Sequence, residues 1–335
     1  MKTALRLTIT AFGLATFNLS AATLYVAERY NGNVVAIDTT TGAGRVVASG
    51  LGGMIGATVD RRGRLFVHRF DAGAVALVDT VNNSFVDIVT GIDGHGLCAD
   101  PNSDTLYLAG YSAQVVYRIT EQQPNNWNVD VVVRGLISPI GVYLQGQLLY
   151  VADRGGFLYV QLDGGTLEEV VALPAGGDII DREAGGHMII GTASQEVYRV
   201  DVVTRQIVRT YEGFANPAGL VVDPTDNSVL VCEHNGHRIT RLNLATDGRS
   251  KLTEFVEVPY QPAFAKDTTI PLSLRLSVLT GNLLSLSWNG GPGIKLQKTT
   301  TLTNPNWQDV DGSDGVSSIN VPMSGGSEFF RLVKP

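Results

Sequence analysis

Two apolar runs joined by a short polar turn form a sequence motif that recurs along most of the chain. The first copy reads LYVAERYNGNVVAID and the last reads VLVCEHNGHRITRLN. The residue that ends the first run recurs at intervals of 41, 41, 43, 39 and 41 residues, at Glu28, Arg69, Gly110, Asp153, Thr192 and Glu233. A period of about 40–45 residues built from several short strands is typical of β-propellers. The pattern therefore predicts an all-β chain whose main part is a six-bladed β-propeller.

Each copy is expected to hold four strands. In the last copy the turn Asn235-Gly236, a strong hairpin signal, joins the second strand to the third. The four strands predicted there are Gly219–Asp223, Val229–Glu233, Arg238–Asn243 and Lys251–Val256. The strands read as nearly continuous apolar runs, which favours sheets that are covered on both faces, as in stacked blades.

The first copy lacks a first strand of its own, which would leave an open sheet edge. The segment 262–267, PAFAKD, echoes PAGLVVD at 217–223 and is one residue shorter. We expect this segment to return to the first blade and to close the ring.

The beginning of the chain has a different pattern. Lys2 and Arg6 precede a mostly apolar stretch, Leu7–Leu19, and small residues follow at 20–22. This order is typical of a signal peptide, and the apolar stretch is shorter than the roughly 20 residues that a membrane span needs. We therefore predict a signal peptide at 1–22, no membrane span, and export to the periplasm or the extracellular space.

The rest of the chain divides into two predicted domains, the propeller at 23–267 and a smaller module at 268–335. The module holds six short strand candidates, which favours a β-sandwich of the immunoglobulin or fibronectin class. Trp288 and Trp307 are expected in its core, with carbohydrate stacking as the alternative.

Composition narrows the classes of function. Charged residues make up 17% of the sequence and the net charge is −7, which disfavours a disordered or nucleic-acid-binding chain. Cys98 and Cys232 fall in the third and sixth copies, too far apart on a ring to pair, so we expect two free, buried thiols. The sequence contains no nucleophile elbow, zinc-protease motif, P-loop or dinucleotide fingerprint.

The blade order places the ends of the second strands and the loops between blades on one face. Glu28, Asp153 and Glu233 belong to this face, and three carboxylates could surround a hard cation such as calcium. They could equally be solvated or paired with arginines, among them Arg69. Both interpretations stay open, and no cofactor is assigned.

A second column on this face is the residue just before the glycine of each first strand. Its members are Ile55, His95, Ile140, Gly176, Ala218 and, in the returning strand, Ala263. His95 alone has acid–base chemistry, and Gly94 and Gly96 on either side leave its ring accessible. His95 is therefore a candidate catalytic residue or ligand contact; the alternative is a histidine that is hydrogen-bonded within its loop.

These segments resemble known families. PAGLVVDPTDNSVLVCEHNGHRITRLN is similar to one blade of gluconolactonases and regucalcin-like lactonases, while LYVAERYNGNVVAID and LYVADRGG resemble NHL repeats. The C-terminal run LSLSW…LQKTTTLTNPNWQDV…FFRLVKP resembles β modules at the C-termini of exported bacterial proteins. The lactonase resemblance implies a metal held by Glu, Asn and Asp in the pre-glycine column. Here that column is largely apolar, and only His95 is a metal-binding type.

Two functions are compatible with these observations. The first is an exported, non-enzymatic scaffold that binds a small molecule, a carbohydrate or a protein. The alternative is a metal-dependent, gluconolactonase-like hydrolase with a cation at Glu28, Asp153 and Glu233 and with His95 as acid or base. The candidate ligand-binding residues are Glu28, Arg69, His95, Asp153 and Glu233.

Overall fold

The computed structural model describes residues 22–161, 165–266, 274–279, 283–288, 295–303, 305–313, 318–322 and 328–333. The chain divides into two compact units, unit 1 and unit 2, with the boundary directly after Lys266. Apart from Ala22, the predicted signal peptide lies outside the described residues. No helix in the described part of the chain is long and apolar enough to cross a membrane.

Unit 1 consists of four-stranded antiparallel sheets, and its described residues form six of them. From its innermost strand outward, sheet 1 holds β24 (Pro259–Phe264), β1 (Thr23–Glu28), β2 (Val34–Asp38) and β3 (Gly44–Ala48). In the same order, sheet 2 holds β4 (Met54–Val59), β5 (Leu65–Arg69), β6 (Ala74–Asp79) and β7 (Ser84–Thr90). Sheet 3 holds β8 (Leu97–Ala99), β9 (Thr105–Gly110), β10 (Val115–Gln123) and β11 (Asn126–Val133).

The second half of unit 1 repeats this pattern. Sheet 4 holds β12 (Pro139–Gln145), β13 (Leu148–Asp153), β14 (Phe157–Gln161) and β15 (Leu167–Ala172). Sheet 5 holds β16 (Ile180–Arg182), β17 (Met188–Gly191), β18 (Val197–Asp201) and β19 (Gln206–Tyr211). Sheet 6 holds β20 (Gly219–Val222), β21 (Val229–Glu233), β22 (Arg238–Leu242) and β23 (Arg249–Thr253).

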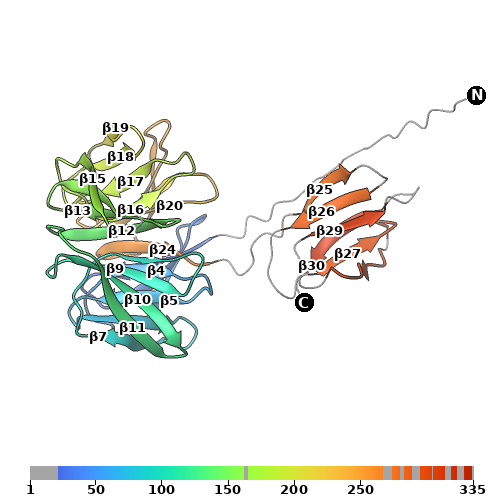
Figure 1. Ribbon diagram of the computed structural model, residues 1–335, viewed down its shortest axis with the longest axis horizontal. Coiled ribbons are helices and arrows are strands. Elements are labelled where there is room, and N and C mark those ends of the chain that lie inside the picture. Colours follow the sequence, from blue (N-terminus) through green and yellow to red (C-terminus); the bar gives the residue numbers. More distant parts are fainter. Residues whose placement is uncertain are drawn as a thin grey trace, which may run out of the picture. The chain divides into compact units, whose positions relative to one another are not determined.

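The innermost strands lie beside one another. β24 contacts β4, β4 contacts β8, and the contacts continue through β12, β16 and β20, which in turn contacts β24. Figure 1 shows β4, β12 and β24 near the middle of unit 1 and β7, β11 and β19 at its periphery. The sheets are therefore arranged radially, and residues far apart in the sequence meet at the middle.

The last strand of unit 1 returns to the first. β24 pairs with β1 in antiparallel register, with Leu24 opposite Phe264 and Val26 opposite Pro262. The prediction that this segment returns to the first sheet is therefore confirmed, although the strand begins at Pro259. Pro262 is tolerated because β24 is an edge strand, where a missing N–H need not break the ladder.

Neighbouring sheets pack through their apolar faces. Val34 of sheet 1 and Val67 of sheet 2 belong to one buried cluster, and four further clusters join sheets 2 to 6 in the same pairwise way. Leu24 of sheet 1 packs in a cluster with Leu230 of sheet 6. Strands such as β21 are buried on both faces, which explains the nearly continuous apolar runs. Each such side chain contributes about 1.5–3 kcal/mol when it is fully buried.

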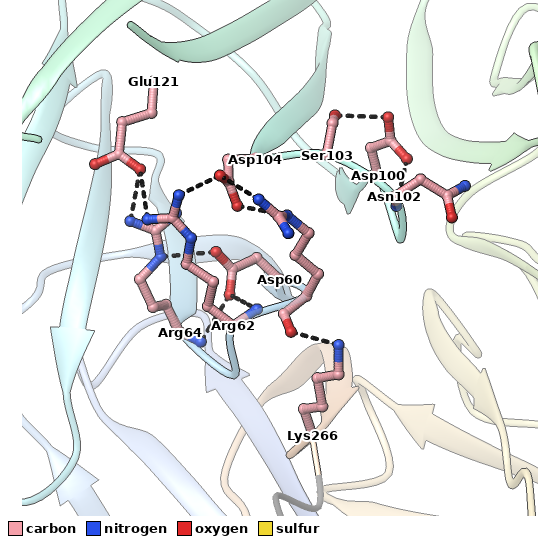
Figure 2. A network of polar contacts seen from close by, with 10 residues as sticks. Asp60, Arg62, Arg64, Asp100, Asn102, Ser103, Asp104, Glu121 and Lys266 are labelled. Carbon is pink, nitrogen blue, oxygen red and sulfur yellow. Dashed lines mark hydrogen bonds and ion pairs between the residues drawn. The ribbon is translucent and has the colours of Figure 1, made fainter. Parts of the chain in front are cut away.

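The turns between the first and second strands use aspartates. Asp60 accepts backbone hydrogen bonds from Arg62 at 2.9 Å and from Arg64 at 2.8 Å. Arg62 also pairs with Asp104, directly before β9, and Arg64 pairs with Glu121 of β10 at 2.8 Å. Figure 2 shows this network, which ties a turn of sheet 2 to sheet 3.

Unit 2 contains two three-stranded sheets among its described residues. One holds β25 (Leu274–Leu279), β26 (Leu283–Trp288) and β29 (Ser318–Pro322); the other holds β28 (Gln308–Asp309), β27 (Lys295–Thr299) and β30 (Phe329–Val333). Leu286 of the first sheet and Leu296 of the second are buried in one apolar cluster. Trp307 is only partly buried and lies 4.4 Å from the guanidinium of Arg331. The side chain of Trp288 lies outside the described residues.

Candidate functional site at the axis of unit 1

The carboxylates at the ends of the second strands are buried. Glu28, Asp153 and Glu233 are at most 3% exposed. Each accepts a hydrogen bond from a backbone N–H of the loop that leads into its own sheet. The donors are Glu257 for Glu28, Ser138 for Asp153 and Ala215 for Glu233. These carboxylates therefore hold the loops between sheets in place.

Glu233 has the strongest set of partners. Arg238 donates to it from Nε at 2.8 Å and from Nη2 at 2.9 Å. Burial alone would raise the pKa of Glu233, but the bonds from Arg238 and neighbouring donors outweigh it, and the pKa is lowered. Arg69 also holds the loop that leads into its own sheet, but as a hydrogen-bond donor: it donates to the Leu51 carbonyl at 2.7 Å. It also pairs with Asp87 at 2.6 Å.

Of the two interpretations left open for Glu28, Asp153 and Glu233, the structure does not favour the one in which they gather around a cation. In the described part of the chain, no group of three or more His, Cys, Asp or Glu side chains could hold a metal ion. The physical reason is that each carboxylate turns toward the loop of its own sheet, where N–H donors satisfy it.

The pre-glycine column does lie at the axis. A Cβ on Gly56 would lie 2.3 Å from the carbonyl oxygen of His95, and one on Gly96 would lie 2.5 Å from that of Ile140. Backbone this close excludes any side chain, so glycine is required at both positions. The contact also identifies the column, since His95 and Ile140 each present their carbonyl to the glycine of the preceding sheet.

The same contact identifies two members that the sequence did not reveal. A Cβ on Gly141 would lie 2.3 Å from the carbonyl oxygen of Asp178, and one on Gly219 would lie 2.0 Å from that of Tyr260. Asp178 therefore represents sheet 5 in the column, and Tyr260 represents sheet 1.

Gly176 and Ala263, which the sequence placed in this column, lie elsewhere. Gly176 approaches the backbone of Arg154, and Ala263 pairs with Tyr25 on β1. The prediction was wrong because the glycine position itself is occupied by Ile179 in sheet 5 and by Gln261 in sheet 1. In both sheets the residue before the presumed glycine position was therefore the wrong one: Gly176 was chosen in place of Asp178, and Ala263 in place of Tyr260.

Asp178 and Tyr260 meet a cation at the axis. Arg154, directly after β13, donates from Nη2 to Asp178 at 2.5 Å and to the Tyr260 hydroxyl oxygen at 3.0 Å. The Tyr260 hydroxyl donates to Asp178 at 3.1 Å. Burial raises the pKa of Asp178, and Arg154 opposes this shift. Burial would lower the pKa of Arg154, but the Asp178 carboxylate reverses the direction and raises it. The Arg154 charge is therefore balanced inside the site.

A second cation, Arg29, lies near the same axis without such a partner. No carboxylate among the described residues is within ion-pair distance of its guanidinium. Its Cζ lies 4.8 Å from the ring centroid of Phe70, 5.4 Å from that of Tyr30 and 5.9 Å from that of Tyr260. Cation–π contacts contribute about 0.5–2 kcal/mol but leave the charge in place. Arg29 therefore gives the site one positive charge in excess.

His95 lies between aromatic rings and is 5% exposed. Its ring centroid is 4.8 Å from that of Tyr111 and 5.4 Å from that of Phe70. Its Nδ1 has no hydrogen-bond partner among the described residues, and neither has the buried Nδ1 of His234. Burial, followed by the two arginine charges, lowers the pKa of His95 to about 3. The ring is therefore neutral near pH 7 and can still donate one hydrogen bond.

These residues form one group, which we call the axial site. Its members are Arg29, Phe70, His95, Tyr111, Arg154, Asp178, His234 and Tyr260. Each sheet of unit 1 supplies at least one of them, from a strand or from a residue within two positions of one.

Apolar side chains fill the axis next to this site. Gln261 reaches from β24 to β8, where it accepts from the Leu97 N–H at 2.9 Å and donates to the Leu97 carbonyl at 2.7 Å. A buried cluster surrounds the axis and consists of Ile55, Ile140, Ile179, Ala218 and Tyr260. The axial site therefore rests on a packed floor, and the partly exposed Arg29 and the 36% exposed Phe70 form its accessible side.

The sequence contained a signal for this site, one residue after the predicted column at the ends of the second strands. The residues directly after the predicted column of Glu28, Arg69, Gly110, Asp153, Thr192 and Glu233 are Arg29, Phe70, Tyr111, Arg154, Ala193 and His234. Successive residues of a strand point to opposite sides. The residue that ends each strand therefore turns to its own loop, and the next one turns to the axis.

Comparison with known proteins bears on the fold of unit 1. Residues 214–242, which include β20, β21 and β22, match the NHL repeat. A chain of a crystal structure of a nidogen/laminin complex aligns with a TM-score of 0.64 at 12% identity, covering 73% of this chain and 98% of that one. Unit 1 has the β-propeller fold.

A second solved structure aligns with the same propeller. It is a functionally unknown protein from Desulfotomaculum acetoxidans DSM 771, with a TM-score of 0.54 at 13% identity, covering 72% of this chain and 86% of that one. A search of curated proteins gave no match. Identities this low show the fold alone. The NHL repeat of the propeller includes Glu233 and His234, so it contains one loop-holding carboxylate and one residue of the axial site.

Proposed function

We propose that unit 1 is a six-bladed, ring-closed propeller of an exported protein, that unit 2 is a β-sandwich, and that the propeller is a scaffold for a protein partner. The contact of β20 with β24 and of β24 with β4 supports ring closure. Docking takes place at the axial site and at the turns between the second and third strands around it. On this proposal the propeller binds its partner without transforming it.

The carrying observation is the exposed aromatic pair beside an unbalanced cation. Tyr30 is 70% exposed and Phe70 is 36% exposed, and the rings of both contact the Arg29 guanidinium. Tyr, Trp and Arg are enriched among the residues that dominate binding energy between proteins. The nidogen/laminin structure that shares this fold is itself a protein complex.

A metal-dependent hydrolase of the gluconolactonase kind lacks a comparable observation. In the described residues the cation ligands that it would need are hydrogen-bonded to loops. His95 is buried between the rings of Phe70 and Tyr111, and neither of these neighbours is a carboxylate that could orient it as an acid or base. We therefore place binding before catalysis.

Displayed protein fragments test the proposal. A phage library of fragments from the source organism is selected on the immobilised full chain, and the enriched fragments are measured against two variants. Tyr30→Ser combined with Phe70→Ser removes the aromatic pair. Val81→Ser combined with Val203→Ser is the matched control, since these side chains are 89% and 88% exposed on turns between the outer strands.

We expect fragments that bind the wild type and the control alike and bind the aromatic variant at least about ten-fold more weakly, a change of about 1.4 kcal/mol. Fragments that bind both variants equally would place the docking surface elsewhere. If no fragment is enriched, the protein-partner proposal fails.

A further inference from the structure

We propose that the axial site takes up the carboxylate of an aspartate or glutamate side chain from the protein partner, with Arg29 as the cation that receives it. This inference rests on the proposed function and names the chemistry of the contact. Three separate observations on the axial site and the character of its surroundings support it.

The first observation is the free hydrogen-bonding capacity of Arg29. Its side chain makes no hydrogen bond or ion pair with any described residue, although it is half-buried among aromatic rings. A guanidinium has five N–H donors in a planar fork that matches a carboxylate. The rings of Tyr30 and Phe70 leave the fork unpaired. A carboxylate would supply the missing partner in a bidentate pair, the strong form of this contact.

The second observation is a buried polar atom that lacks a partner. His95 is 5% exposed, and its Nδ1 has no hydrogen-bond partner among the described residues. Its ring and the Arg29 guanidinium both contact Phe70, so the two groups flank the same aromatic side chain. A carboxylate accepts several hydrogen bonds and can therefore use both the guanidinium and a neutral imidazole.

The third observation is the charge balance. Arg154 is already paired with Asp178, and the Tyr260 hydroxyl donates to the same carboxylate. One positive charge is left for the ligand. A monoanion neutralises it, whereas a dianionic phosphate would leave a negative charge next to the buried Asp178.

The surroundings favour a side chain over a free ion. Phe70 and Tyr111 flank His95, and the neighbouring Tyr30 is 70% exposed. The methylene groups of Glu or Asp and their apolar neighbours in a peptide can pack on these rings. A small hydrated anion cannot use that surface.

Matched peptides test the inference on the full chain. The probes are acetyl-Leu-Glu-Leu-amide, acetyl-Leu-Gln-Leu-amide and sodium phosphate, each titrated at constant ionic strength. The readout is the ¹H–¹⁵N signal of the arginine Nε–H groups, in which Arg29 is assigned by the signal that Arg29→Gln removes. The control is Arg134→Gln, because Arg134 is an exposed arginine of the loop between β11 and β12 on the same face.

We expect a saturable shift of the Arg29 signal with the Glu peptide and a shift at least about ten-fold weaker with the Gln peptide, a difference of about 1.4 kcal/mol. Arg134→Gln should leave the Glu titration unchanged. In Arg29→Gln, whose folding is checked by its melting curve, the peptide should no longer perturb the ¹H signals of His95. Equal shifts with both peptides, or a Glu titration that persists in Arg29→Gln, would overturn the inference.

Three further outcomes separate this inference from the proposed function. If phosphate binds at Arg29 more tightly than the Glu peptide, the site takes an anion of another source and the inference fails. If the Glu peptide does not bind while fragments still depend on Tyr30 and Phe70, the scaffold proposal stands and the carboxylate inference alone is lost. If the peptide binds but no fragment is found, the carboxylate site stands without its proposed partner class.

Discussion

The Arg154 guanidinium lies 2.5 Å from the fully buried carboxylate of Asp178, although the two residues belong to neighbouring sheets. This ion pair joins sheet 4 to the loop before sheet 5 and orients the Tyr260 hydroxyl. Breaking a buried pair by removing one partner typically costs about 3–5 kcal/mol, because the remaining charge stays buried and unpaired.

We therefore expect Arg154→Met to lower the free energy of unfolding by about 3 kcal/mol or more. Adding Asp178→Asn should recover most of this loss, since it removes the uncompensated charge and keeps an acceptor for Tyr260. Urea unfolding of the two single variants and the double variant gives the coupling energy. Additive losses would show that the pair is not a unit.

Glu233 provides a test of the loop-holding role. In Glu233→Gln an NH₂ group replaces one of two oxygens that each accept two hydrogen bonds. We expect a loss of about 1–3 kcal/mol in the free energy of unfolding, because a buried donor is left unsatisfied. Glu254→Gln is the control, since Glu254 is 64% exposed, and its effect should stay within about 0.5 kcal/mol.

The same pair of variants separates a structural carboxylate from a metal ligand. On the structural interpretation, chelator changes the melting temperature of neither the wild type nor Glu233→Gln. A melting temperature that falls with chelator in the wild type and not in Glu233→Gln would contradict it.

The buried His68 should make the free energy of unfolding fall as the pH is lowered. It is fully buried, and burial lowers its pKa to about 4 from 6.5. Because the folded state favours the neutral ring, this stability is complete above the unfolded pKa and is lost as pH falls from about 6.5 to about 4. We expect a loss on the order of 2–3 kcal/mol between these limits.

The variant His68→Leu should lack this loss, and urea unfolding at pH 7.5 and pH 4.5 measures it. His237→Gln, on an exposed turn, should keep the wild-type dependence. Asp181 acts in the opposite sense, since burial raises its pKa to about 6 and its stability is lost as pH rises toward that value. Asp181 is present in every variant, so its effect cancels in the comparison. Identical pH profiles for the wild type and His68→Leu would refute the assignment.

The reactivity of the two cysteine thiols tests how tightly their sheets are packed in the native chain. Cys98 and Cys232 are free thiols, as the sequence predicts; Cys232 is buried, whereas Cys98 is only partly buried. Burial raises the pKa of Cys98 to about 12 and that of Cys232 further still. Since the thiolate is the reactive form, we expect neither to react with a disulfide reagent at pH 8 in the native chain and both to react in denaturant. Rapid labelling of a native thiol would show that its sheet opens locally.

The repeat pattern was sufficient to predict the strands that are buried on both faces. Val229–Glu233 was predicted and is found as β21, and the third strand differs only in its last residue. The outermost strand was less accurate, at Lys251–Val256 in place of Arg249–Thr253. This strand is largely exposed, so it carries a weaker apolar signal and its bounds depend on pairing with its neighbour.

The axial site was harder to predict for two physical reasons. The first is a one-residue offset: Arg29 and Arg154 follow the residues that were chosen, and strand alternation turns them to the axis. The second is local irregularity, because register shifts occur where β24 meets β1 and where β12 meets β13. Bulges of this kind re-aim side chains, and no spacing rule reveals them. Tyr260 was missed because Gln261 occupies the glycine position of sheet 1, whereas His95 was found beside its two glycines.

The pairing of β24 with β1 sets the order in which unit 1 can complete its folding. Sheets 2 to 6 are each made from one continuous segment, whereas sheet 1 needs strands from opposite ends of the unit. Contacts so distant in sequence form late, because a long loop must close before they stabilise anything. A growing chain can therefore assemble its other sheets while the edge of β1 stays unpaired. We expect amide protons of β1 and β24 to gain protection from exchange last, which makes that edge the vulnerable one for a chain that is stalled or cut before Phe264.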